Sequence, residues 1–130
     1  MATARLPEPD WKRQARALLG EYKPEILSIM RWVGLKRVTL TVTTETPDIA
    51  VAIGPDRTPR VLIGHKWVEA ESKPERLKRV IHELKGHVGL GMSHSERSRA
   101  RGYYSDPDRD QLSWQWYRQW AEWNNSRRAK

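Results

Sequence analysis

The sequence predicts an α+β fold in which a small, mostly antiparallel sheet packs against one helix, with further helices at the N- and C-terminal ends. Three observations support this prediction. Apolar residues recur at helical spacing before residue 35 and again after residue 107. Between them, residues 36–68 hold three runs rich in β-branched side chains. Another helical pattern follows these runs and begins with a capping signature.

Two helices are expected in the N-terminal region. The first covers residues 9–22, with Asp10 as its candidate cap and Gly20 as its candidate stop. The second covers residues 23–35, where apolar side chains share one helical face, and Gly34 ends the pattern.

Three strands are expected next, over residues 36–46, 49–54 and 60–68. Proline-containing turns at residues 47–48 and 55–60 separate them. Because both connections are short, we expect antiparallel hairpins.

The next helix should cover residues 73–90 and end at Gly89 or Gly91. Ser72 is followed three residues later by Glu75, which is the capping-box pattern, and a proline lies in the tolerated first turn.

A final helix is expected over residues 108–126, which contain four of the seven tryptophans of the chain. Aromatic residues at helical spacing are usually core residues, although they can also form a stacking surface for single-stranded nucleic acid. The expected core face consists of Leu112, Trp116, Trp120 and Trp123. Trp114 and Tyr117 lie off this face, so one aromatic side can remain exposed.

Length and composition limit the classes of protein. With 130 residues, the chain should form one domain over residues 1–130. It has no cysteine, so disulfides and thiolate metal sites are excluded, and any metal must be held by His, Asp or Glu. The N-terminal residues have no long apolar run, so we expect neither a signal peptide nor a membrane span, and a cytoplasmic location.

The net charge of +8, from 24 basic and 16 acidic residues, permits binding to nucleic acid. The basic residues are spread along most of the chain, which is also typical of a solvated surface. Nucleic acid is therefore a less favoured partner.

The most informative motif is H-E-x-x-x-H, with His82, Glu83 and His87. Two histidines four residues apart lie about 40° apart around an α-helix, but five residues give about 140°, too wide to share a metal. A π-bulge, one wider turn, absorbs the extra residue. Gly86 precedes His87, where it gives the backbone freedom for such a turn.

This motif, H-E-x-x-G-H, resembles the zinc motif of the dipeptidyl peptidase III family. More broadly, strands followed by a His-Glu helix resemble the zincin metallopeptidases, in which the substrate lies along the sheet edge. The continuation GHVGLGMSH resembles the metzincin pattern H-E-x-x-H-x-x-G-x-x-H. It departs from that pattern because His87 and His94 are seven residues apart instead of six, and Met92 lies before His94.

The resemblance implies one Zn²⁺ per chain in a zincin-like fold, with His82 and His87 as ligands, Glu83 as general base and His94 as third ligand. Other carboxylates are alternatives for the third ligand: Glu96, Asp106, Asp108 and Asp110. The cluster of Asp106, Asp108 and Asp110 is more typical of a turn and helix cap. His65, at the end of a predicted edge strand, is expected to be an ordinary strand residue.

The sequence therefore predicts a zinc-dependent peptidase that acts on a peptide or protein substrate and has no membrane partner. Two alternatives stay open. One is a zincin-like domain that binds metal but regulates or binds a partner instead of cleaving it. The other is a basic nucleic-acid-binding domain with incidental histidines. The oligomeric state and the identity of the metal are not determined by the sequence.

Overall fold

The computed structural model describes residues 9–53, 58–89 and 107–128. The described elements are α1 (Asp10–Glu21), α2 (Lys23–Val33), β1 (Thr39–Val42), β2 (Ile49–Ile53), β3 (Pro59–Ile63), α3 (His65–Val68), α4 (Lys73–Ile81), the π-helix η1 (His82–Gly89) and α6 (Pro107–Arg128). Helices and a small sheet are thus mixed, and the predicted α+β class is confirmed. No helix among these described residues is long and apolar enough to cross a membrane.

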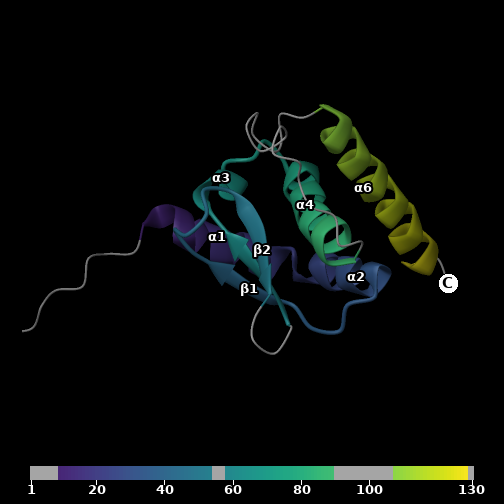
Figure 1. Cartoon of the computed structure of the whole chain (residues 1–130), viewed down its shortest axis with the longest axis horizontal. Helices are drawn as coiled ribbons and strands as arrows, with labels where there is room; N and C mark the ends of the chain where they lie inside the picture. Colours follow the sequence, from purple (N-terminus) through teal and green to yellow (C-terminus); the bar gives the residue numbers. More distant parts are fainter. Residues whose placement is uncertain (1–8, 54–57, 90–106, 129–130) are drawn as a thin grey trace, which may run out of the picture.

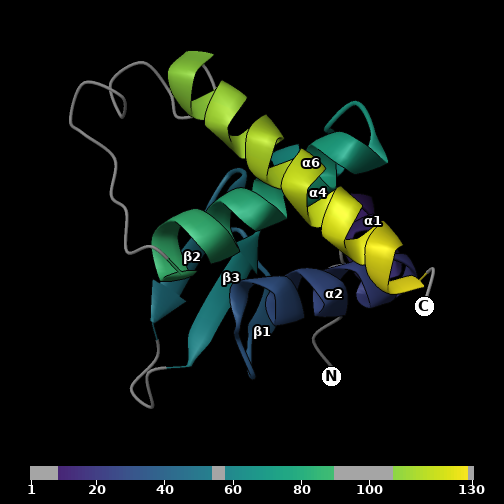
Figure 2. The same cartoon turned by 90° about the vertical axis from the view of Figure 1, so that its right-hand side faces the viewer.

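The elements form three layers (Figures 1 and 2). The three-stranded sheet is the first layer, α2 and α4 cover one of its faces, and α6 lies across α2 and α4 on the far side. The face of the sheet toward the helices is apolar, as the alternation of side chains along each strand requires. Its side chains are Leu40, Val42, Ile49, Val51, Val61 and Ile63.

The strand order is β1-β3-β2, and only half of the predicted antiparallel pairing is correct. β2 and β3 form the expected antiparallel hairpin, but β1 pairs with β3 in parallel. β1 and β2 are therefore not a hairpin, and the chain between them passes over the end of β3.

This crossing depends on Gly64, directly after β3. A Cβ atom on Gly64 would overlap the carbonyl oxygen of Thr46 and the backbone of Pro47. The crossing is held by backbone hydrogen bonds from Gly64 to Asp48 and from Lys66 to the carbonyl oxygen of Pro47 (2.8 Å). Only a glycine allows the two segments to approach this closely.

The third predicted strand is too long. It ends at Ile63, and His65–Val68 forms the short helix α3 instead. Trp67, fully buried, explains the change because its Nε1 donates to the carbonyl oxygen of Arg76 on α4 (3.1 Å). The prediction for His65 is also wrong, since β3 is the central strand and His65 lies on α3, with its ring 6.1 Å from that of Trp11.

The predicted ends of the helices are partly correct. Asp10 is the first residue of α1 and not its cap, and Gly20 lies inside α1, which continues to Glu21. Gly34 ends α2 as expected, with a φ of 93° that favours glycine. The capping box is confirmed, because the amide of Glu75 donates to Ser72 Oγ at 3.3 Å.

The tryptophans of α6 pack mainly into the core. Trp116 and Trp120 are 6% and 4% exposed, which confirms their predicted core role and removes them from any stacking surface. Trp120 Nε1 donates to Ser28 Oγ of α2 at 3.1 Å, so the indole is both buried and satisfied. Trp114 and Tyr117 are partly buried and lie edge to face against each other.

Candidate metal centre

The motif helix changes its geometry where the motif begins. α4 is an α-helix up to Ile81, and η1 continues it from His82 to Gly89 as a π-helix. In a π-helix the hydrogen bonds join residues five apart, so residues with that spacing lie above one another. The predicted wider turn is confirmed, and it extends over the whole motif instead of one turn. His82 and His87 consequently point to the same side.

Gly86 has a different role from the predicted one. Among the described glycines, the positive φ belongs to Gly34, so Gly86 does not need the conformational freedom of glycine. Instead, a Cβ atom on Gly86 would lie 3.2 Å from the ring of Trp116 on α6. The missing side chain lets η1 and α6 approach closely.

Three side chains of η1 form a group that can hold a metal ion: His82, Glu83 and His87. One ligand atom from each lies within 4.8 Å of the others. The two imidazole rings are 5.1 Å apart between centroids, and His87 Nε2 is 3.7 Å from Glu83 Oε2. His82 and Glu83 are buried, at 4% and 3% exposure, whereas the side chain of His87 is 18% exposed. The group therefore opens to solvent on the side of His87.

Ser113 of α6 fixes the ring of His82. Its hydroxyl, also buried, lies 2.8 Å from Nδ1 of His82. A ligand histidine commonly makes such a bond with one nitrogen, which orients the other nitrogen toward the metal. No sequence pattern pointed to Ser113, because its position beside His82 depends on how α6 packs on α4.

The carboxyl group of Glu83 has a raised pKa. Burial, and to a smaller degree the negative charge of Asp48, raise its pKa to about 8. In the metal-free protein the carboxyl group is therefore largely protonated at neutral pH. A divalent cation beside it would favour the ionised form.

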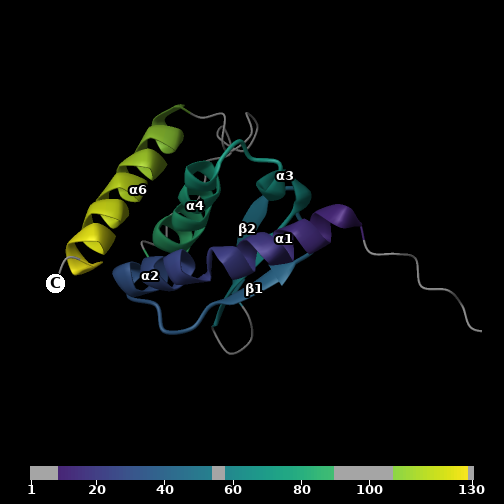
Figure 3. The same ribbon diagram turned by 180° about the vertical axis from the view of Figure 1, so that it is seen from behind.

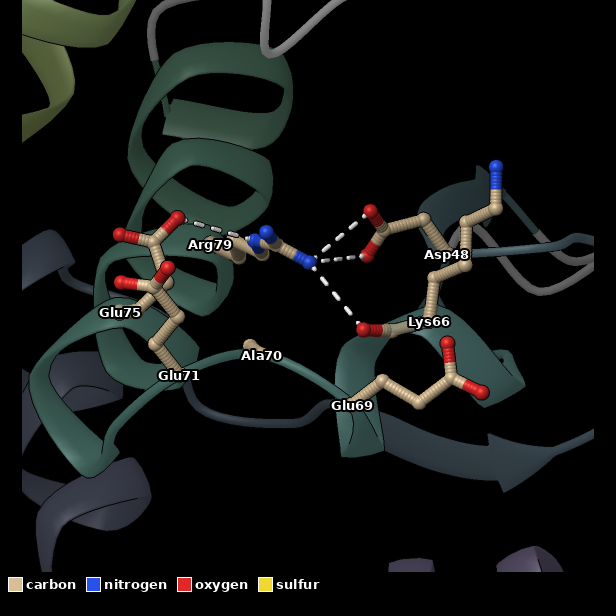
Figure 4. Close-up of a pocket in the computed structure, with 7 residues that line it drawn as sticks. All are labelled: Asp48, Lys66, Glu69, Ala70, Glu71, Glu75 and Arg79. Atoms are coloured by element: carbon tan, nitrogen blue, oxygen red, sulfur yellow. Dashed lines mark hydrogen bonds and ion pairs between the residues drawn. The ribbon is translucent and has the colours of Figure 1, made fainter.

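Asp48 lines a polar pocket of about 440 Å³, together with Glu75 and Arg79 of α4 (Figure 4). Arg79 spans it, donating to both oxygens of Asp48 (3.2 and 3.0 Å), to Glu75 Oε1 (3.2 Å) and to the carbonyl oxygen of Lys66 (3.3 Å). Burial still raises the pKa of Asp48, against the opposing effect of Arg79. Arg79 thus ties α4 to the loop before β2.

The donor set suits zinc. Two imidazoles are ligands that Zn²⁺ accepts, and the carboxylate of Glu83 beside them can serve as a further ligand or as a base. Zn²⁺ in catalytic sites takes three protein ligands. The side chains of the other predicted ligands lie outside the described residues: His94, Glu96, Asp106, Asp108 and Asp110. His65, which is described, does not belong to the group.

Comparison with known proteins adds no relative: no protein-family model, no curated protein and no solved structure matches this chain.

Proposed function

We propose that the protein is a zinc-dependent peptidase. The observation that supports this most directly is the placement of His82, Glu83 and His87 on one side of η1, with ligand atoms within 4.8 Å of one another. The five-residue spacing would separate the histidines on an α-helix, but the π-helix brings them together.

In this proposal His82 and His87 bind the zinc, through Nε2 in the case of His82, because its Nδ1 is engaged with Ser113. Zinc supplies Lewis acidity and lowers the pKa of bound water. Glu83 takes the proton from the attacking water. Burial raises the pKa of Glu83 in the metal-free protein, and a bound cation would oppose this effect and favour the carboxylate, which is the form that accepts a proton. His94 remains the proposed third ligand.

The position of β2 supports a peptide as substrate. β2 is an edge strand and contacts η1, so an extended chain paired with it would run past the histidines. Ile53 of β2 is 60% exposed, and Ala52 beside it is also exposed. The zincins, which the motif resembles, bind substrate along a sheet edge in this way.

A metal-binding domain without turnover is the second candidate, because His82 and Glu83 are almost completely buried. That burial leaves little room at the metal for a scissile bond. In this case zinc would stabilise the fold or a bound partner.

The test begins with the zinc content of the purified protein beside that of a His82→Ala/His87→Ala double variant. About one zinc per chain in the wild type and none in the variant is expected. Equal zinc contents would contradict the site. A peptide library is then incubated with the wild type and with Glu83→Gln. Cleavage by the wild type alone supports the peptidase, whereas bound zinc with no cleavage by either protein supports the second candidate.

A further inference from the structure

A second feature lies at the opposite edge of the sheet. α1, α2 and β1 enclose an apolar groove of about 460 Å³. Its floor is formed by Leu40 and Val42 of β1, and its wall by Leu19 of α1 with Leu27 and Met30 of α2. Leu27, which lines the groove, is 42% exposed and is therefore accessible to a ligand.

The groove continues the apolar face of the sheet. Leu40 pairs with Val61 and Val42 pairs with Ile63, so these side chains point to the same face as the buried residues of β3. β1 has β3 on one side, and no strand among the described residues on the other. The helices α1 and α2 lie along the same side of the molecule as β1 (Figure 3). A strand added to β1 would therefore lie beneath them.

Charge indicates what kind of strand would fit. The two charged residues of the lining, Arg16 of α1 and Lys23 of α2, are both cationic. Lys36 and Arg37, both exposed, come just before β1 in the chain. The groove is thus apolar inside and positively charged at its border.

We propose that this groove binds an extended segment of a partner protein, in which apolar side chains alternate with polar ones and acidic residues stand at the ends. The segment adds to the free edge of β1 through main-chain hydrogen bonds. Its apolar side chains contact Leu27 and Leu40, and its acidic residues meet Arg16 and Lys23. This surface is separate from the metal centre, which contacts the other edge strand, β2.

The test uses a capped heptapeptide in which valine alternates with threonine and glutamate stands at both ends. A matched peptide carries lysine at both ends. The Kd of each peptide for the full-length protein is measured by titration. The binding site is located from the NMR chemical-shift changes of backbone amide signals. The acidic peptide should bind with a Kd below about 1 mM, shift the amides of Thr39–Val42 and bind less tightly as salt is raised. The lysine peptide should bind at least about tenfold more weakly.

Two variants locate the contact further. Leu27→Glu should weaken binding of the acidic peptide about tenfold, since it removes an apolar contact and adds a repulsive charge. Lys23→Glu, at an exposed position, should weaken binding of the acidic peptide about threefold. Arg118→Glu, on the exposed face of α6, is the control with the same change of charge and should have no effect.

Three results would overturn the proposal. One is equal binding of the two peptides. Another is amide shifts at β2 instead of β1, which would assign the peptide to the metal-site edge. The third is saturable binding of dodecanoate at β1 with no binding of either peptide, because the groove would then be a site for a small apolar anion. None of these results bears on zinc binding, so the metal site is tested separately, and only shifts at β2 would bear on the sheet edge proposed for the peptidase substrate.

Discussion

At the scale of single residues, the candidate metal centre depends on buried polar groups that support one another. His82 and Glu83 are buried polar residues in a core that is otherwise almost entirely apolar. Such groups are costly to bury unless hydrogen bonds or ions compensate for the lost water. Ser113 provides one such bond to His82. Burial, with a smaller contribution from the negative charge of Asp48, raises the pKa of Glu83.

Ser113→Ala should weaken zinc binding about tenfold, because His82 loses the bond that orients its ring. The measurement is a zinc Kd from competition with a chromophoric chelator, which does not depend on activity. Ser126→Ala, at an exposed position on the same helix, is the control and should leave the Kd unchanged. An unchanged Kd in Ser113→Ala would show that the hydroxyl does not position the ligand.

Glu83 should make the metal-free protein less stable as the pH rises. Its folded pKa of about 8 lies above the ordinary value of 4.5, so the folded state binds the proton more tightly. The stabilisation is complete below pH 4.5 and is lost as the pH rises toward 8, with a limiting slope of about 1.4 kcal/mol per pH unit.

The check is urea unfolding of the wild type and of Glu83→Gln between pH 4.5 and 8, with a chelator present. The difference in unfolding free energy between the two proteins reports the ionisation of Glu83 together with its electrostatic coupling to Asp48. We expect the wild type to lose stability relative to the variant across this range. Parallel curves would mean that Glu83 ionises normally in the fold.

At the scale of the elements, two glycines allow close contacts between segments, and these contacts determine how the helices and strands are arranged. Gly86 lets η1 lie against Trp116, and Gly64 lets the β1–β2 connection cross the end of β3. The sequence predicted most elements correctly, because helical and alternating patterns are local. It missed α3, because the residues of α3 continue the β-rich run in the sequence. They form a helix instead of a strand because Trp67 is buried against α4. It predicted a hairpin for β1 because loop length alone does not reveal which strand lies between two others.

Gly64→Ala should lower the unfolding free energy by about 1–3 kcal/mol, since the new methyl group meets backbone that has little room to move. Gly20→Ala is the matched control. It lies inside α1 with no atom within 4 Å of the added Cβ, so it should raise stability by about 0.5–1 kcal/mol. Urea unfolding of the three proteins gives both values. A Gly64→Ala variant as stable as the wild type would contradict the tight crossing.

At the scale of the whole molecule, the candidate metal centre lies where two layers meet. His82, Glu83 and His87 come from η1, which contacts β2 of the sheet, while Ser113 comes from α6. The contact between His82 and Ser113 therefore connects the motif helix with α6. The groove is built on β1, the strand at the other edge of the sheet from β2.

Zinc should raise the melting temperature of the whole domain, because an ion that binds the folded state alone stabilises it by about 2.7 kcal/mol at a hundredfold excess over its Kd. Thermal unfolding is followed with added zinc, with magnesium as the control ion, and with the His82→Ala/His87→Ala variant. The shift is expected for zinc with the wild type alone. An equal shift in the double variant would place the ion elsewhere.

The sequence by itself determined the α+β class, the capping box at Ser72, the end of α2 at Gly34 and the need for a wider turn between His82 and His87. Each of these follows from the spacing or type of neighbouring residues. Only the tertiary structure decided the place of β1 beside β3, the role of Gly86 and the contact of Ser113 with His82. These depend on contacts between segments far apart in the chain, and local patterns carry no information about such contacts.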